Sequence, residues 1–363
     1  MYVSRLEVEN LRGFRGARNV DLDLTRPDGS HAGWTVLAGP NGAGKSTLLA
    51  ALAAALGEET DPAGWLAPGA DEGGIRLDGA HWRVTRTDDG LSARRNGAHG
   101  FWACYPARRE LTDGVGWLVG QQLQALEYRP GAVELVAGVR GLLDDGLLPA
   151  GHRIGRIDSD GVQIDVGGTE YGLSGGFAAV VGLVLGLLAR THHAYPEQEL
   201  VIEGTPPSVP VPGVVLIDEV EAHLHPEWQQ RLGEWLVGHF PRLQFVVSTH
   251  SPYVCQAADP GGLVRLPGPG EESAPYVLDE DLYQRIVYGS GDDAALTELF
   301  GLPSVYSPQA EAERRLLIAL ERKLYAGHAS SAEVAEYREL GARLNASLSA
   351  RVDEARDRLG GAR

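Results

Sequence analysis

The sequence predicts an α/β fold that ends in an all-helical extension. Two short apolar runs, Val214–Ile217 and Phe245–Ser248, are bounded by polar turns, as buried parallel strands are. A third run, Trp34–Ala38, leads into a glycine-rich loop. The alanine- and leucine-rich segment Ser46–Leu56 follows it and predicts a helix. After about Asp281 the pattern predicts helices and no strands.

The remaining elements are predicted by periodicity and by capping residues. Strands are expected at Tyr2–Val8, Val20–Leu24, Ile75–Leu77 and Trp82–Thr85, and as a hairpin of Arg153–Ile157 with Val162–Val166. Helices are expected at Trp117–Leu147, Gly175–Arg190 and Glu227–Phe240. In the tail, Ser307 precedes Pro308 as an N-cap. Ser330 with Glu333 forms a capping box for a last helix that carries Leu340, Leu344, Leu348 and Val352.

Charge and composition narrow the classes of function. The 363 residues carry a formal net charge of −17, whereas a protein that binds DNA mainly through its phosphates has a basic surface. Tight autonomous DNA binding is therefore disfavoured. No run of about 18 apolar residues is present, so no membrane-spanning segment is predicted. The two cysteines, Cys104 and Cys255, form no C-x-x-C pair, which favours a reduced cytoplasmic compartment over a zinc or disulfide framework.

The segment Gly39–Ser46, with the sequence GPNGAGKS, fits the pattern G-x-x-x-x-G-K-[ST] between a strand and a helix. In this pattern the loop N–H groups surround nucleotide phosphates, and the helix dipole adds a positive field. Lys45 would reach the β- and γ-phosphates, and Ser46 would hold Mg²⁺. Only one other lysine, Lys323, occurs among 32 basic residues, which suggests that arginine does not serve at position 45. The predicted nucleotide contacts are Gly39, Asn41, Gly42, Ala43, Gly44, Lys45, Ser46 and Thr47.

Three polar residues follow the two buried strands. Asp218, at the end of the first strand, is placed to bind Mg²⁺, and Glu219 beside it can polarise the attacking water. His250, after the second strand, can hydrogen-bond the γ-phosphate. An isolated acidic pair is usually a solvated turn, and an isolated histidine is usually a surface or core residue. The upstream phosphate loop makes the functional interpretation the better one.

A second anion-binding surface is predicted where Ser174, Gly175 and Gly176 begin an apolar helix. Because the chain already has a phosphate loop, this surface is expected to cap the γ-phosphate of ATP held by another copy. A plain serine N-cap is an equally good interpretation of the tetrapeptide taken alone.

The order of these four motifs resembles that of the ABC-type ATPases, in which they are Walker A, signature, Walker B and H-loop. The segments Val3–Phe14 and Asp218–Pro226 resemble the branch that contains Rad50, SMC, RecF and the OLD-type ATPases. The resemblance covers about residues 1–270. It implies a P-loop NTPase fold of the ABC-ATPase type, with a mixed central sheet, an antiparallel β lobe, a helical inserted lobe and a C-terminal helical hairpin. It also implies ATP and Mg²⁺ as cofactors, Lys45, Glu219 and His250 as catalytic residues, and a head-to-tail homodimer on ATP binding.

The resemblance divides the chain into a head, residues 1–280 with an inserted lobe at about 58–190, and a helical extension, residues 281–363.

Two features depart from the family pattern. Phe177 follows the signature glycines where relatives usually carry Gln or Glu, and no clear Q-loop glutamine is present. Arg108 or Arg109 is expected near the nucleotide instead, with solvated surface arginines as the alternative. Arg12 or Phe14 is a candidate for stacking on adenine, with a buried aromatic as the alternative.

The hydrolytic site is the one catalytic site that the sequence predicts, so the protein is expected to be a switch that acts on a partner. Leu296–Leu302 and the helical hairpin after it resemble the carboxyl end of the AAA-family ATPases of Septu and retron-type anti-phage defence, which pair with a separate HNH nuclease. A packing hairpin that only stabilises the fold is an equally good interpretation of this segment. One alternative is a RecF- or SMC-like clamp that binds DNA directly in repair or maintenance. A less favoured one is a transporter ATPase subunit. Residues 47–173 lack sustained heptads and any C-x-x-C, so a Rad50-type coiled coil with a zinc hook is not expected.

Overall fold

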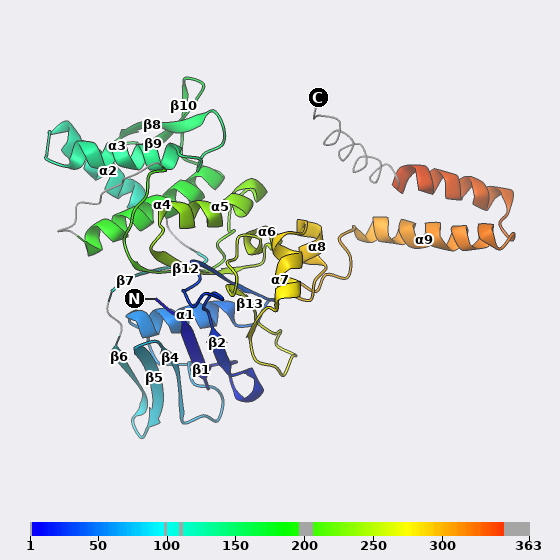
Figure 1. Ribbon diagram of the computed structural model, residues 1–363, viewed down its shortest axis with the longest axis horizontal. Coiled ribbons are helices and arrows are strands. Elements are labelled where there is room, and N and C mark those ends of the chain that lie inside the picture. Colours follow the sequence, from blue (N-terminus) through cyan, green and yellow to red (C-terminus); the bar gives the residue numbers. More distant parts are fainter. Residues whose placement is uncertain (1, 98–99, 109–111, 196–205, 345–363) are drawn as a thin grey trace. The chain divides into compact units, whose positions relative to one another are not determined.

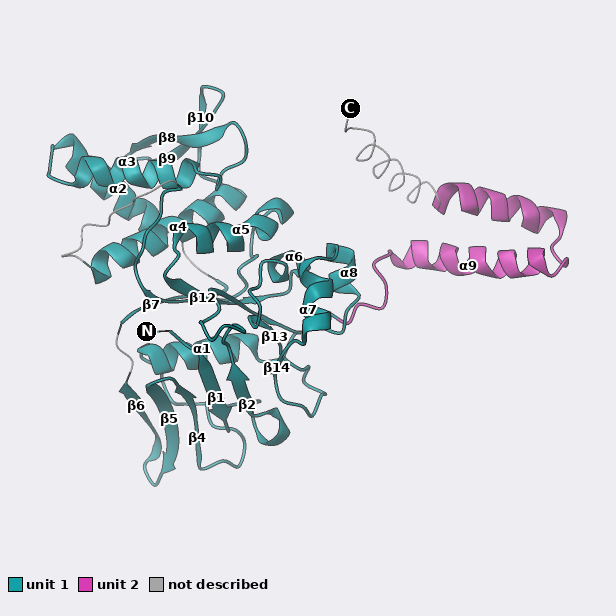
Figure 2. Cartoon of the chain, in the orientation of Figure 1, with its two compact units in different colours: residues 1–300 teal, residues 301–363 magenta. Residues whose placement is uncertain are grey.

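The computed structural model describes residues 2–97, 100–108, 112–195 and 206–344. The chain divides into two compact units, Met1–Phe300 and Gly301–Arg363 (Figure 2). The first unit contains a central sheet, an antiparallel sheet and a three-stranded sheet, with helices on both faces of the central sheet (Figure 1). This arrangement confirms the predicted α/β class.

The central sheet is mixed, as expected. Its strand order is β14 (Tyr276–Val277), β13 (Leu263–Arg265), β3 (Trp34–Ala38), β12 (Leu243–Thr249), β11 (Gly213–Ile217) and β7 (Phe101–Tyr105). All neighbours are parallel except β14 with β13. The carboxyl ends of β3, β12 and β11 therefore lie side by side at one edge of the sheet.

The antiparallel sheet has the order β2 (Val20–Asp23), β1 (Arg5–Glu9), β4 (Glu72–Leu77), β5 (Ala80–Thr87) and β6 (Gly90–Gly97). Val8 pairs with Ile75, so the stretch 72–97 completes a sheet begun by the first strands. The inserted lobe expected at about 58–190 is therefore divided between this sheet, strand β7 and a separate helical region. Helix α1 (Lys45–Leu56) packs against both sheets through one apolar cluster that includes Leu52 and Leu216.

The opposite face of the central sheet is covered by the helical region. Its elements are α2 (Thr112–Leu126), α3 (Ala132–Asp144), β8 (His152–Asp158), β9 (Gly161–Val166), β10 (Thr169–Gly172), α4 (Gly175–Ala194) and α5 (Pro226–His239). Val215 and Ile217 of β11 point to this side, because side chains alternate along a strand. By length and composition α4 would pass as a membrane-spanning helix, but Leu185 and Leu188 are buried in this core. It is a core helix of the head.

The head continues beyond residue 280, the boundary that the sequence suggested. Helices α6 (Pro252–Cys255), α7 (Glu280–Val287) and α8 (Gly291–Ala295) belong to the first unit. The Tyr283 hydroxyl donates to the Ala258 carbonyl at 2.8 Å, and Ile286 and Leu299 are buried. This burial, which helical periodicity does not reveal, places the end of the head at Phe300.

The second unit contains a helical hairpin of α9 (Pro308–Tyr325) and a helix over residues 331–344. Ser307 caps α9, and Ser330 and Glu333 exchange the two hydrogen bonds of the predicted capping box. The Lys323 ammonium also pairs with Glu333 at 2.6 Å. The predicted helix positions Leu348 and Val352 lie outside the described residues.

Candidate functional site

The phosphate loop connects β3 to α1, and its backbone requires glycine at several positions. Gly39, Gly42 and Gly44 have φ of 151°, 78° and 104°, a region that side chains disfavour. A Cβ on Gly39 would lie 2.3 Å from the Leu266 carbonyl oxygen, and one on Gly44 would lie 2.7 Å from the Phe14 ring. The glycines of the predicted motif therefore allow close contact with neighbouring segments as well as a tight turn.

Lys45 is the first residue of α1, and its ammonium lies inside the phosphate loop. Nζ donates to the carbonyl oxygens of Gly39 at 2.8 Å and Pro40 at 3.2 Å. Burial lowers the pKa of this ammonium, and the carboxylates that follow β11 act in the opposite direction. Only 6% of the residue is exposed, whereas Ser46 next to it is exposed. A desolvated cation in such a loop is suited to an anionic ligand.

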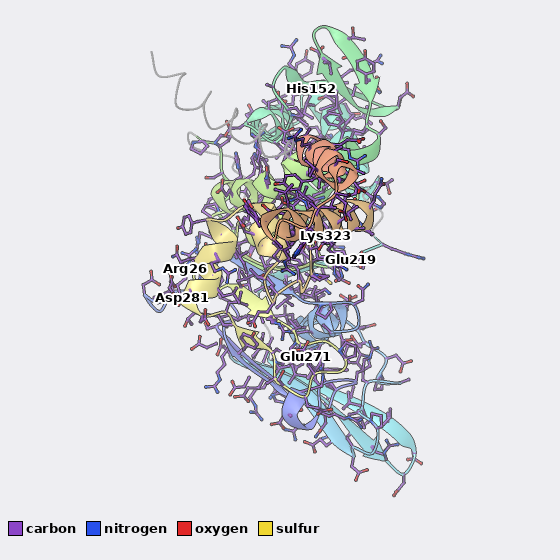
Figure 3. The ribbon with its side chains drawn as sticks, turned by 90° about the vertical axis from the view of Figure 1, so that its right-hand side faces the viewer. Arg26, His152, Glu219, Glu271, Asp281 and Lys323 are labelled. Carbon is purple, nitrogen blue, oxygen red and sulfur yellow. The ribbon has the colours of Figure 1, made fainter. Side chains whose placement is uncertain are left out.

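The acidic pair after β11 is held by a serine on the neighbouring strand. The Ser248 hydroxyl donates to Asp218 Oδ1 and accepts the N–H of Glu219 at 2.8 Å. Asp218 is half-buried, whereas Glu219, which is labelled in Figure 3, is exposed. Glu219 also has a positive φ of 45°, a left-handed conformation that costs a non-glycine residue about 1 kcal/mol. The two carboxylates thus occupy different environments at the end of one strand.

A third carboxylate fixes the start of the segment that carries His250. Glu221 accepts hydrogen bonds from the Thr249 hydroxyl at 2.8 Å and from the His250 N–H at 2.5 Å. His250 is exposed at the carboxyl end of β12, which lies between β3 and β11. The structure therefore brings the phosphate loop, the acidic pair and the histidine to the same edge of the sheet.

Two family models match the segments that build this edge. A model described as "AAA domain" matches residues 5–66, and one described as "AAA domain, putative AbiEii toxin, Type IV TA system" matches residues 174–256. Among solved structures, the SmcHead bound to the C-winged helix domain of ScpA aligns with a TM-score of 0.52 at 15% identity. That alignment covers 77% of this chain and 98% of the Smc chain. The chain therefore has a P-loop NTPase fold of the ABC-ATPase type.

The chain is also similar to two bacterial proteins whose names refer to Septu and retron systems. The Septu protein PtuA of Bacillus mycoides (strain KBAB4) is 25% identical over 293 residues, which are 69% of this chain and 38% of PtuA. The Retron Ec83 probable ATPase of Escherichia coli is 35% identical over 103 residues, which are 28% of this chain and 17% of that protein. The alignments span less than half of the length of either relative.

The predicted signature segment, residues 173–176, leads into α4. Ser174 is the N-cap, but its side chain makes no capping hydrogen bond to the helix. Ser174 and Gly175 are exposed, and a Cβ on Gly175 would meet nothing within 4 Å. A Cβ on Gly176 would instead lie 2.7 Å from the ring of Trp228 on α5. The segment therefore has an open side and a packed side.

Three residues that contribute to this candidate site were not identified from the sequence. Ser248 and Glu221 hold the acidic pair and the histidine segment, and Arg18 donates to the carbonyl of Ala43 in the phosphate loop at 3.4 Å. Ile217 pairs with Val247, so the parallel register sets Ser248 beside Asp218. Once the two strands are paired in this register, the sequence identifies Ser248 as the neighbour of Asp218. No motif spacing in the sequence indicates a role for Arg18.

The structure buries one of the two candidates for stacking on adenine. Phe14 is only 1% exposed and packs beneath Gly44, so it is unable to stack on adenine. The Arg12 guanidinium lies 4.2 Å from the centre of the Trp65 ring. The alternative of a buried aromatic at position 14 is therefore the correct one.

The arginines expected near the nucleotide follow β7. Arg108 lines a cavity of about 370 Å³ together with Tyr105 and Arg190. Strand β7 is three positions from β3 in the sheet, which corresponds to about 14 Å at the usual strand spacing. Arg108 is thus at the same edge, three residues after Tyr105, whose carbonyl accepts the Asp218 N–H at 2.8 Å, and Arg109 lies outside the described residues.

Proposed function

We propose that the chain is an ATPase and that it binds Mg·ATP at the edge formed by β3, β12 and β11. Lys45 and the N–H groups of residues 39–47 hold the phosphates, because a glycine-rich loop before a helix directs its donors at an anion. Ser46 and Asp218 hold Mg²⁺ through oxygen ligands, which this ion prefers. The desolvated ammonium of Lys45 inside the loop supports this assignment.

Hydrolysis requires a second copy of the chain. Ser174, Gly175 and Gly176 of that copy close over the γ-phosphate, Glu219 polarises the attacking water, and His250 contacts the γ-phosphate. The observation that carries this proposal is the open side of the signature. Ser174 and Gly175 are exposed, and the hydroxyl of Ser174 is not engaged in capping its own helix. A head-to-tail homodimer would place each signature against the ATP of the other copy.

In the cell, we propose that this cytoplasmic dimer is a switch in anti-phage defence. The similarity to a Septu protein and to a retron ATPase supports this role. ATP would set the state of the dimer, and the helical hairpin after Gly301 would dock an effector, with an HNH-type nuclease as the partner proposed.

The dimer is tested with Glu219→Gln in the full chain. This change preserves the size of the side chain and removes the carboxylate that polarises water, so ATP is bound but not hydrolysed. Light scattering with Mg·ATP should report twice the mass found with ADP. A variant that stays monomeric in ATP would refute the shared site.

A second candidate function is a clamp that binds DNA. Arg83 on β5 and Arg94 on β6 are cross-strand partners and are both exposed, and Arg83 also pairs with Glu72 at 2.8 Å, so this surface of the acidic chain has one excess positive charge among the three. Isolation of the protein from its native host, with and without ATP, distinguishes the candidates. A co-purifying HNH nuclease supports the switch, whereas recovery of DNA without a protein partner supports the clamp.

A further inference from the structure

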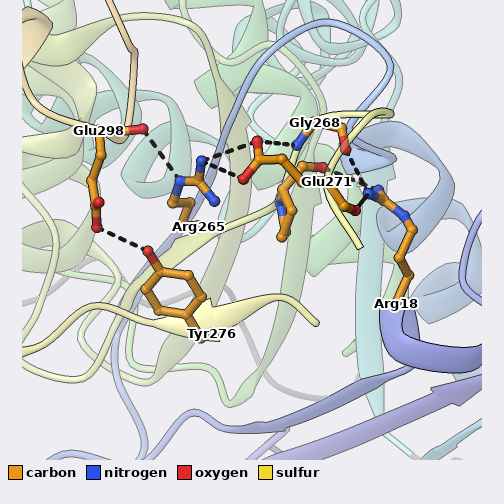
Figure 4. A network of polar contacts seen from close by, with 7 residues as sticks. Arg18, Arg265, Gly268, Glu271, Tyr276 and Glu298 are labelled. Atoms are coloured by element: carbon orange, nitrogen blue, oxygen red, sulfur yellow. Dashed lines mark hydrogen bonds and ion pairs between the residues drawn. The ribbon is translucent and has the colours of Figure 1, made fainter. Parts of the chain in front are cut away.

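Arg18 joins three segments of the head. It ends the short helix η1 (Gly16–Arg18), and its guanidinium donates to main-chain carbonyl oxygens (Figure 4). These are Gly268 at 2.5 Å, Glu271 at 2.7 Å, Pro267 at 3.0 Å, Gly13 at 3.3 Å and Ala43 at 3.4 Å. The guanidinium has five N–H groups in a rigid plane, so one side chain can hold several acceptors at fixed angles.

The loop of residues 266–271, which provides three of these acceptors, lies against the phosphate loop. The Leu266 N–H donates to the Ala38 carbonyl at 2.8 Å. A Cβ on Gly39 would lie 2.3 Å from the Leu266 oxygen, and one on Gly42 would lie 3.5 Å from the ring of Pro269. The 266–271 loop therefore limits the shape of the phosphate loop on one side, and Arg18 bonds to both.

The 266–271 loop is itself held in place by a carboxylate. Glu271 accepts the N–H of Gly268 at 2.8 Å and the Arg265 guanidinium at 2.8 and 3.1 Å. The Gly268 hydrogen bond and, after it, Arg265 lower the pKa of Glu271, so this carboxylate stays charged near neutral pH. Arg265 also donates to the Glu298 carbonyl at 3.2 Å. Arg18 thus bonds to a loop that is anchored in the head.

We propose that Arg18 is a positioning residue for ATP binding. The carbonyl of Ala43 and the N–H of Gly44 belong to one planar peptide group, so fixing the oxygen fixes the direction of the N–H. Hydrogen bonding at the oxygen also polarises the peptide and strengthens its N–H as a donor. Arg18 therefore directs a phosphate-binding donor without touching the nucleotide. This inference rests on the proposed binding of ATP phosphates by residues 39–47.

The test compares Arg18→Ala and Arg18→Lys in the full chain. We expect KM for ATP, and Kd for a fluorescent ATP analogue, to rise about tenfold, with kcat at saturating ATP within about twofold of the wild type. Lysine should not restore binding, because a single ammonium is unable to span carbonyls of separate loops. Arg26→Ala is the matched control, because Arg26 is also half-buried but pairs with Asp259. It should leave KM unchanged.

A double-mutant cycle adds a second readout. Glu271→Ala loosens the same loop, so its effect on Kd should be largely lost in the Arg18→Ala background. Independent effects of the two changes, a fall in kcat with unchanged KM, or an equal rise in KM for Arg26→Ala would each overturn the inference. If the wild type does not bind the ATP analogue, the proposed nucleotide site itself is refuted. If the wild type binds the analogue and Arg18→Ala binds it with the same Kd, only the role of Arg18 is refuted.

Discussion

Ser248→Ala removes the hydroxyl that joins the two acids after β11. That hydroxyl donates to Asp218 and accepts from the Glu219 N–H, so the variant loses one hydrogen bond to a carboxylate and one to the backbone. A hydrogen bond to a charged group contributes about 1.5–3 kcal/mol. Glu219 also holds a left-handed backbone, which the N–H bond helps to maintain. The Asp218 carboxylate and the Glu219 backbone should therefore be held less firmly.

If this energy is lost from the transition state, kcat should fall by about ten- to hundredfold, because about 1.4 kcal/mol corresponds to one factor of ten. ATP binding should change little, since Lys45 and the phosphate loop remain intact. Steady-state phosphate release over a range of ATP concentrations measures both quantities. Ser290→Ala is the control, because Ser290 also makes two hydrogen bonds, in the capping box of α8. A Ser248→Ala enzyme with unchanged kcat would refute the reasoning, as would an equal loss in Ser290→Ala.

Two further predictions address the shared site and the support of the phosphate loop. Lys45→Ala and Ser174→Arg should each abolish ATP hydrolysis. An equimolar mixture of the two variants should recover part of the activity, because a mixed dimer contains one site with an intact phosphate loop and an intact signature. A mixture that releases no phosphate would argue against sites built from two chains. Phe14→Ala should lower the free energy of unfolding by about 3–5 kcal/mol in urea titrations and weaken ATP binding, because a buried ring beneath Gly44 is removed. A loss of stability without any change in ATP affinity would show that the ring supports the fold alone.

The sequence predicted the parts of the site that depend on local pattern. The parallel pairing of β11 with β12 was anticipated from two apolar runs, and that pairing places Asp218 and His250 at one edge. The need for glycine at position 44 was also anticipated, but its cause was not. The Phe14 ring that excludes a side chain there comes from another segment, and no local periodicity reports such a contact.

Two features that the sequence did not predict depend on burial or on side-chain contacts with main-chain atoms. Tyr283 and Ile286 extend the hydrophobic core of the head beyond residue 280. The sequence pattern of their helix does not distinguish it from the helices of the tail. Arg18 bonds to carbonyl oxygens, which every residue type supplies, so no partner residue in the sequence identifies its role. The dimer, Mg²⁺ binding and the roles of individual site residues stay predictions.

The contact between Gly176 and Trp228 has a kinetic consequence. Trp228 belongs to α5, which begins shortly after the acidic pair. The Gly176 backbone lies against the Trp228 ring and near the His223 carbonyl. In the proposed dimer, a movement of the acidic segment at one ATP would reach the signature of the same copy, and therefore the second ATP. Occupancy of the two sites would then be cooperative, and the rate of hydrolysis would depend sigmoidally on ATP concentration.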